Sequence, residues 1–149
     1  MKKFLSNLLL GKIVYKESTN VSFEKVIKTL EKAIKANDFS ITTVHDLKQT
    51  FTKAKSSLDK DFEYKIVQIC NAEKSHKVLT TMSYDLGIMM PKSIVVAREN
   101  GETTLRFMTM KPWMVGMMFP GIDITQMSKN VMGTMKKIVD ETIKSVEKE

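Results

Sequence analysis

Cys70 is the one cysteine of the chain, and it stands at the end of a predicted strand, directly before Asn71 and a predicted helix. Backbone N–H groups and the helix dipole at such a position stabilise a thiolate, which could act as a nucleophile, carry a persulfide or bind a soft metal. The commoner alternative is a buried cysteine that packs as a small apolar side chain. Because the sequence places no base beside Cys70, packing is favoured over chemistry.

The two histidines, His45 and His76, add little to this thiol. His76 lies toward the edge of the apolar face of the helix after Cys70, and one cysteine with two separated histidines lacks the spaced ligand pairs of a zinc site. A Cu(I) or haem site built on methionine is conceivable, but methionine at helical spacing is usually core. No phosphate-binding glycine loop or acid–base pair is recognisable. We therefore expect no metal or cofactor, and we name Cys70, Asn71, His76 and Trp113 as candidate ligand-binding or thiol residues.

The segment Pro112–Ile122 carries no charge, holds the only tryptophan and belongs to a chain with 12 methionines. It is too short to span a membrane. It either packs over the domain or offers an apolar surface to a partner, a ligand or a lipid interface. We expect a homodimer whose interface includes part of Trp113–Phe119 or the helical stripe Met132, Met135 and Val139. A small apolar or thiol ligand is a further expected partner.

The composition is that of an ordinary folded domain, with 42% hydrophobic and 28% charged residues. A chain of 149 residues is expected to form one domain, 1–149, with its own core. The net charge of +7 rests on lysines interleaved with acids, and Arg98 and Arg106 are the only arginines. Nucleic-acid binding is therefore disfavoured. A single cysteine excludes an intramolecular disulfide and fits a cytoplasmic location.

The start of the chain imitates an export signal, but polar residues interrupt its apolar stretch and no cleavage site follows. Its apolar side chains, Phe4, Leu5, Leu8 and Leu9, would share one face of a short helix. We expect residues 1–11 to form an amphipathic segment packed on the domain. A degenerate export signal and attachment to a membrane surface through the nearby lysines are the alternatives.

Alternating and β-prone runs predict the strands, at residues 13–15, 40–47, 61–70, 94–96 and 103–110. In the clearest strand, 61–70, Val67 and Ile69 lie on one face and Ile66 and Cys70 on the other. Asn-Gly at 100–101 predicts a tight hairpin between the last two strands, because both turn positions need positive φ.

Apolar residues at three-and-four spacing predict the helices. The first follows Ser22 as N-cap and ends at Asn37, which we expect in the left-handed conformation. A weak helix is expected over 48–58, and Asn71 caps another that runs through Met82 with Val78, Leu79 and Met82 facing inward. The last covers 123–149. This order predicts an α+β fold: two layers, with helices on one face of a mixed or antiparallel sheet that includes the hairpin.

Three motifs together resemble the domain of unknown function 302 family. They are Val-Gln-Ile-Cys-Asn at 67–71, Leu-Gly-Ile-Met-Met-Pro at 86–91 and Ser-Phe-Glu at 22–24. The resemblance spans roughly residues 12–112 and implies a compact two-layer α+β domain, a homodimer, and no established activity.

The chain departs from that family at two positions. Ala72 stands where the family favours proline, and Lys92 stands where many members carry a second cysteine. Dithiol chemistry is therefore not carried over to this chain. The sequence favours a binding or interaction module with an apolar pocket or partner surface over an enzyme. The alternative is a thiol-based sulfur carrier or redox protein that uses Cys70.

Overall fold

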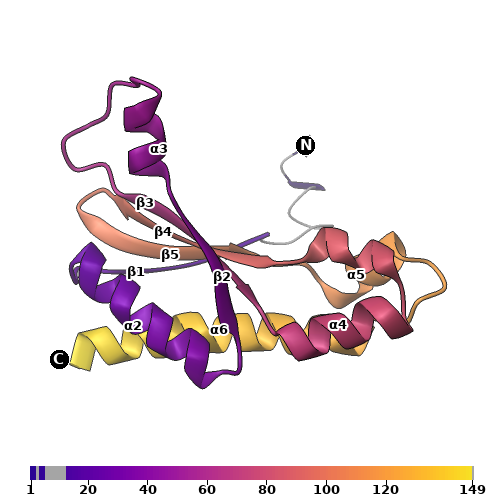
Figure 1. The fold of residues 1–149 in the computed structure, drawn as a ribbon. Coiled ribbons are helices and arrows are strands. Elements are labelled where there is room, and N and C mark those ends of the chain that lie inside the picture. Colours follow the sequence, from indigo (N-terminus) through magenta and orange to yellow (C-terminus); the bar gives the residue numbers. More distant parts are fainter. Residues whose placement is uncertain (3, 6–12, 149) are drawn as a thin grey trace.

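The computed structural model describes residues 1–2, 4–5 and 13–148, and its centre is a five-stranded antiparallel sheet (Figure 1). The strands lie side by side in the order β1-β5-β4-β3-β2. Their bounds are β1 Val14–Thr19, β2 Ser40–Asp46, β3 Tyr64–Cys70, β4 Lys92–Glu99 and β5 Glu102–Met108. The α+β prediction is confirmed, and the sheet is antiparallel rather than mixed.

The hairpin between β4 and β5 is confirmed where the Asn-Gly pair placed it. Asn100 and Gly101 have φ values of 53° and 80°, the left-handed backbone that this turn needs. Val96 pairs with Leu105 across the two strands. The turn therefore fixes the register of the central pair of strands.

Helices α2 (Phe23–Ala36) and α6 (Thr125–Lys148) cover one face of the sheet. Figure 1 shows α6 running under the full length of the sheet, with α2 beside it under the left-hand half. The core between the layers takes alternate strand residues, among them Val67, Ile69, Ile94 and Val96, each at most 2% exposed. Burying one such side chain stabilises the fold by about 1.5–3 kcal/mol before entropy is counted.

A second, smaller hydrophobic cluster lies at one end of the sheet, formed by four buried side chains: Leu86, Val115, Phe119 and Ile124. It is built by α4 (Ala72–Thr81), the 3₁₀-helix η1 (Tyr84–Met89), α5 (Pro112–Met118) and the approach to α6. In Figure 1 these elements gather at the right-hand end. Helix α5 was not foreseen in the uncharged segment. Pro112 begins it, and Val115 and Phe119 turn inward from it.

A long-range hydrogen bond fastens the edge strand to the long helix. The Tyr15 hydroxyl donates to Oδ1 of Asp140 at 2.5 Å, and the Tyr15 ring lies 5.2 Å from that of Phe107. The bond to the carboxylate, with burial, raises the pKa of Tyr15. Because β1 contacts the sheet only through β5, this bond is a second anchor for the edge strand.

Several local predictions were wrong. Asp38, with φ of 62°, takes the left-handed position expected of Asn37, whose φ is −108°. Met82 is exposed instead of facing inward, because α4 ends at Thr81 before its next turn reaches the small cluster. Ser22 is the N-cap of α2, but its side chain makes no capping hydrogen bond.

Some element bounds also differ from the predicted ones. The first strand is longer than 13–15, the strand at 61–70 begins only at Tyr64, and the weak helix is confined to α3, Leu47–Lys53. The C-terminal helix and its inward stripe are confirmed.

Most of the amphipathic segment expected at residues 1–11, including Leu8 and Leu9, lies outside the described residues. Phe4 and Leu5, which are described, are exposed. No helix among the described residues combines the length and the apolar character that crossing a bilayer requires.

Candidate functional site

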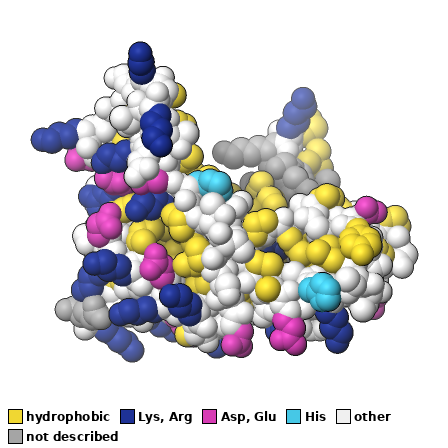
Figure 2. Space-filling model, viewed as in Figure 1, with side chains coloured by type: hydrophobic (Ala, Val, Ile, Leu, Met, Phe, Trp, Pro, Cys, Tyr) yellow, Lys and Arg dark blue, Asp and Glu magenta, His cyan; other side chains and the backbone are white. Residues whose placement is uncertain are grey.

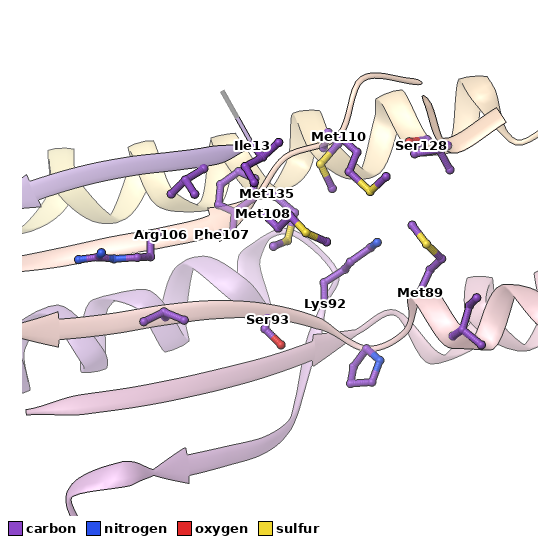
Figure 3. Close-up of a pocket in the computed structure, with 16 residues that line it drawn as sticks. Ile13, Met89, Lys92, Ser93, Arg106, Phe107, Met108, Met110, Ser128 and Met135 are labelled. Carbon is purple, nitrogen blue, oxygen red and sulfur yellow. The ribbon is translucent and has the colours of Figure 1, made fainter. Parts of the chain in front are cut away.

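A cavity of about 480 Å³ opens where the two hairpin strands part. Pairing between β4 and β5 ends at Val95 and Arg106. Beyond that point β4 stays paired with β3 as far as Lys92, and β5 stays paired with β1 as far as Met108. The two strands therefore diverge toward the right-hand end of the sheet, and Figure 3 shows side chains from both projecting into the gap.

The cavity lies at the junction of the two hydrophobic clusters. Sixteen residues line it, and most are apolar. Five of them are methionines, which come from η1, β5, the segment after β5, and α6: Met89, Met108, Met110, Met132 and Met135. Unbranched, polarizable methionine side chains repack readily around different shapes. The lining can thus adapt to an apolar guest.

Lys92 occupies a position of β4 that the alternation assigns to the core. It pairs with Ile69 and shares a face with Ile94 and Val96, all three fully buried. Its side chain crosses the gap between the strands, with Met89 on one side and Met108 on the other (Figure 3). Within the described part of the chain its ammonium has no ion-pair or hydrogen-bond partner, and loss of water lowers the pKa of Lys92.

Arg106 is the other charged residue of the described lining, but its guanidinium already has an ion-pair partner. Its guanidinium donates to the carboxylate of Glu99 and, at 2.7 Å, to the hydroxyl of Thr104. Lys16 also donates to Glu99, at 2.8 Å, and these two cations lower the pKa of Glu99. The Nε–H of Arg106 is buried and makes no hydrogen bond. Lys92 is therefore the charged residue of the described lining that has no ion-pair partner.

Cys70 and Asn71 lie away from this cavity, at the junction of β3 and α4. The Cys70 sulfur is half-buried and lies 2.9 Å from the hydroxyl of Ser75, a neutral partner. The Asn71 side chain accepts from the backbone N–H of Lys74 and donates to the carbonyl of Asp38. Asn71 thus caps α4, as predicted, and ties it to the turn before β2.

His76 and Trp113, the other two candidates, lie on different helices. His76 is exposed on α4, and Trp113 is 50% exposed on α5. None of the four candidate residues lines the cavity between β4 and β5, and in the described part of the chain neither His76 nor Trp113 is hydrogen-bonded to Cys70. Whether any of them binds a ligand stays a prediction.

Exposed hydrophobic side chains gather near the cavity on η1 and α5. The largest are Tyr84, Ile88, Trp113, Met117 and Met118. Figure 2 shows such side chains over the right-hand half of the molecule, where α4 and α5 lie in Figure 1. By contrast Met135 and Val139, which we expected as a possible dimer interface, are buried against the sheet of the same chain.

The sequence led us to expect an apolar pocket or partner surface, but neither its position between β4 and β5 nor Lys92 as a lining residue was predicted. One signal was available: Lys92 begins a run whose alternate members, Ile94 and Val96, are plainly core residues. The parting of β4 and β5 leaves no comparable mark in the sequence.

Comparison with known proteins agrees with the fold. The family model described as "Domain of unknown function DUF302" matches residues 14–142. A crystal structure described as an uncharacterized conserved protein DUF302 from Bacillus stearothermophilus superposes with a TM-score of 0.75 at 18% sequence identity. The match covers 87% of this chain and 98% of that one. No curated protein matches the chain.

Proposed function

The chain belongs to the DUF302 family, a domain of unknown function, and we propose that it is a binding module for a small apolar molecule. The observation that carries the proposal is the methionine-lined cavity between β4 and β5. Its volume of about 480 Å³ falls within the roughly 300–1,000 Å³ typical of small-molecule sites.

The position of the cavity supports binding more than it supports chemistry. The lining comes from β1, β4, β5, η1, α5 and α6, so a guest would contact elements from both hydrophobic clusters. Its described residues include two serines but no aspartate, glutamate, histidine or cysteine, so they offer neither an acid–base pair nor an activated nucleophile. An apolar wall with few polar groups is the usual composition of a binding pocket.

A soft metal ion held by the methionine sulfurs is the competing use of such a lining. The charge of the cavity argues against it. Both charged residues of the described lining, Lys92 and Arg106, are cations. Arg106 is paired with Glu99, and no carboxylate of that lining pairs with Lys92. A metal cation would be repelled in a site where water screens poorly.

The proposal can be tested with decan-1-ol, an uncharged probe with an apolar chain, and protein carrying ¹³C-methyl methionine. We expect the methyl signals of the lining methionines to shift on titration, and those of Met82 and Met117, which do not line the cavity, to stay. Ser128→Phe, which fills the cavity from α6, should abolish the shifts. Ser145→Phe, an exposed serine on the same helix, is the matched control.

Two results would contradict a binding role for this cavity. One is the absence of any saturable shift with decan-1-ol. The other is shifts that persist unchanged in Ser128→Phe, because the probe would then bind elsewhere.

A second copy of the chain is also a proposed partner. The exposed apolar side chains of η1 and α5, including Ile88 at 78% and Met117 at 73%, support self-association through this end of the molecule. Since Ile88 also lines the cavity, such a contact would lie beside its opening.

A further inference from the structure

We propose that the apolar ligand carries a single negative charge, which the ammonium of Lys92 binds. This inference rests on the proposed binding function and deepens it, because it names the chemical class: an amphiphile with one anionic group, such as an alkyl carboxylate. The observations that support it are the position of Lys92, its lack of a partner and the charge of the lining.

The position of Lys92 is unfavourable for a lysine. The same face of β4 holds Ile94 and Val96, and the neighbouring position of β3 holds Ile69, all completely buried. An unpaired ammonium among such side chains loses water without gaining a counter-ion. A lysine in this place has a physical rationale if a ligand supplies the counter-ion, since groups that are costly for folding concentrate at functional sites.

Among the described lining residues, no carboxylate supplies that counter-ion. In the described lining Arg106, from β5, is the other charged residue, and its guanidinium is already paired with Glu99, which also binds Lys16. The residues that β1, η1, α5 and α6 contribute to the lining are all uncharged. Among the described residues, a ligand anion would therefore meet Lys92 as the lining cation without an ion-pair partner, with the hydroxyls of Ser93 and Ser128 as further lining donors.

The number of free charges favours a monoanion over a phosphate. Phosphate sites usually combine several backbone N–H groups or arginine forks, which match a doubly charged group. Here Lys92 is the one cation of the described lining without an ion-pair partner, and most of that lining is apolar, so one carboxylate balances its charge. The rest of the ligand would lie against the methionines, where burial of an alkyl chain or a ring removes apolar surface from water.

The test compares decanoate with decan-1-ol, two probes that share a chain and differ in charge, by calorimetry on three proteins. For Lys92→Met, which removes the charge and keeps an unbranched side chain, we expect decanoate binding to weaken by about tenfold or more, the effect typical of a lost charge-assisted contact. Decan-1-ol should bind this variant at least as well as the wild type. Lys77→Met, an exposed lysine on α4, should change neither affinity.

The pH dependence gives an independent readout. An anion that pairs with Lys92 raises the pKa of the ammonium on binding, so decanoate affinity should be full at neutral pH and fall as the pH rises through the pKa of Lys92. Among the described lining residues Arg106 is the other ionisable one, and the rest carry no ionisable side chain. Decan-1-ol affinity should not follow the same curve.

The outcomes separate the two proposals. If both probes bind and Lys92→Met weakens neither, the anionic ligand is refuted and the apolar site stands. If neither probe binds the wild type, both proposals fail. Selective loss of decanoate in Lys92→Met, with decan-1-ol retained, supports the anion site and shows that the variant is folded.

Discussion

Replacing Lys92 by methionine should make the folded protein more stable. The position faces the core, Ile69 and Ile94 beside it are fully buried, and the ammonium has no partner within the described part of the chain. A buried polar group without a hydrogen bond costs about 1–3 kcal/mol in protein mutational data. Lys92 is only half-buried and can extend its charged end toward the cavity opening, so we expect the lower end of that range.

The expected gain is therefore about 1 kcal/mol in the free energy of unfolding, or roughly 2–4 °C in melting temperature for a chain of this size. Urea unfolding followed by circular dichroism measures it. Lys77→Met, at an exposed position of α4, is the matched control and should stay within about 0.5 kcal/mol of the wild type.

The pH dependence checks the cause of the gain. Because the pKa of Lys92 is lowered from 10.5, the folded chain binds this proton less tightly than the unfolded chain does. The cost is thus present below the lowered pKa and shrinks as the pH rises toward 10.5, so the advantage of Lys92→Met should shrink with it. A variant that is less stable than the wild type at neutral pH would refute this reasoning, because it would mean that Lys92 makes a favourable contact.

Three other changes test the remaining features. Tyr15→Phe should lower the free energy of unfolding by about 1.5–3 kcal/mol, since it removes a hydrogen bond to the carboxylate of Asp140. Because the pKa of Tyr15 is raised, that contribution should be complete below about pH 10 and should shrink progressively as the pH rises further. A destabilisation by Tyr15→Phe that does not change with pH would contradict this account. Cys70→Ser should cost at most about 1–2 kcal/mol, and iodoacetamide should alkylate the native thiol no faster than free cysteine; faster alkylation would favour the thiol-based alternative. Light scattering should show a dimer that Met117→Asp with Met118→Asp dissociates, and a wild-type mass of one chain at all concentrations would exclude self-association.

The parts of the fold that sequence analysis predicted well are those coded by neighbouring residues. Asn100-Gly101 specifies its turn through backbone φ alone, and the apolar stripe of α2 specifies which side of the helix is buried. Helix α5 was not predicted, because the uncharged segment Pro112–Ile122 lacks the charged face of an amphipathic helix. The proline at its first turn and the four-residue spacing of Val115 and Phe119 were the relevant signals.

The cavity could not be predicted in the same way, because it depends on where two paired strands separate. The point of separation depends on how the segment from β5 to α5 packs against η1, which precedes β4, and these segments are far apart in the chain. Lys92 looked like one surface lysine among many until the register placed it beside Ile69. Cys70 was a candidate because of its residue type, yet its polar partner is the neutral hydroxyl of Ser75 and not a base.

The sheet order has a consequence for how the chain reaches its native state. Strand β1 is made first during synthesis, yet its one partner in the sheet is β5, and its hydrogen bond to Asp140 joins residues 125 positions apart. The hairpin of β4 and β5 can close locally, whereas β1 has to wait until most of the chain has emerged. Recruitment of β1 is therefore a late event with a large loop-closure entropy, and until then the outer edge of β5 stays open to other chains.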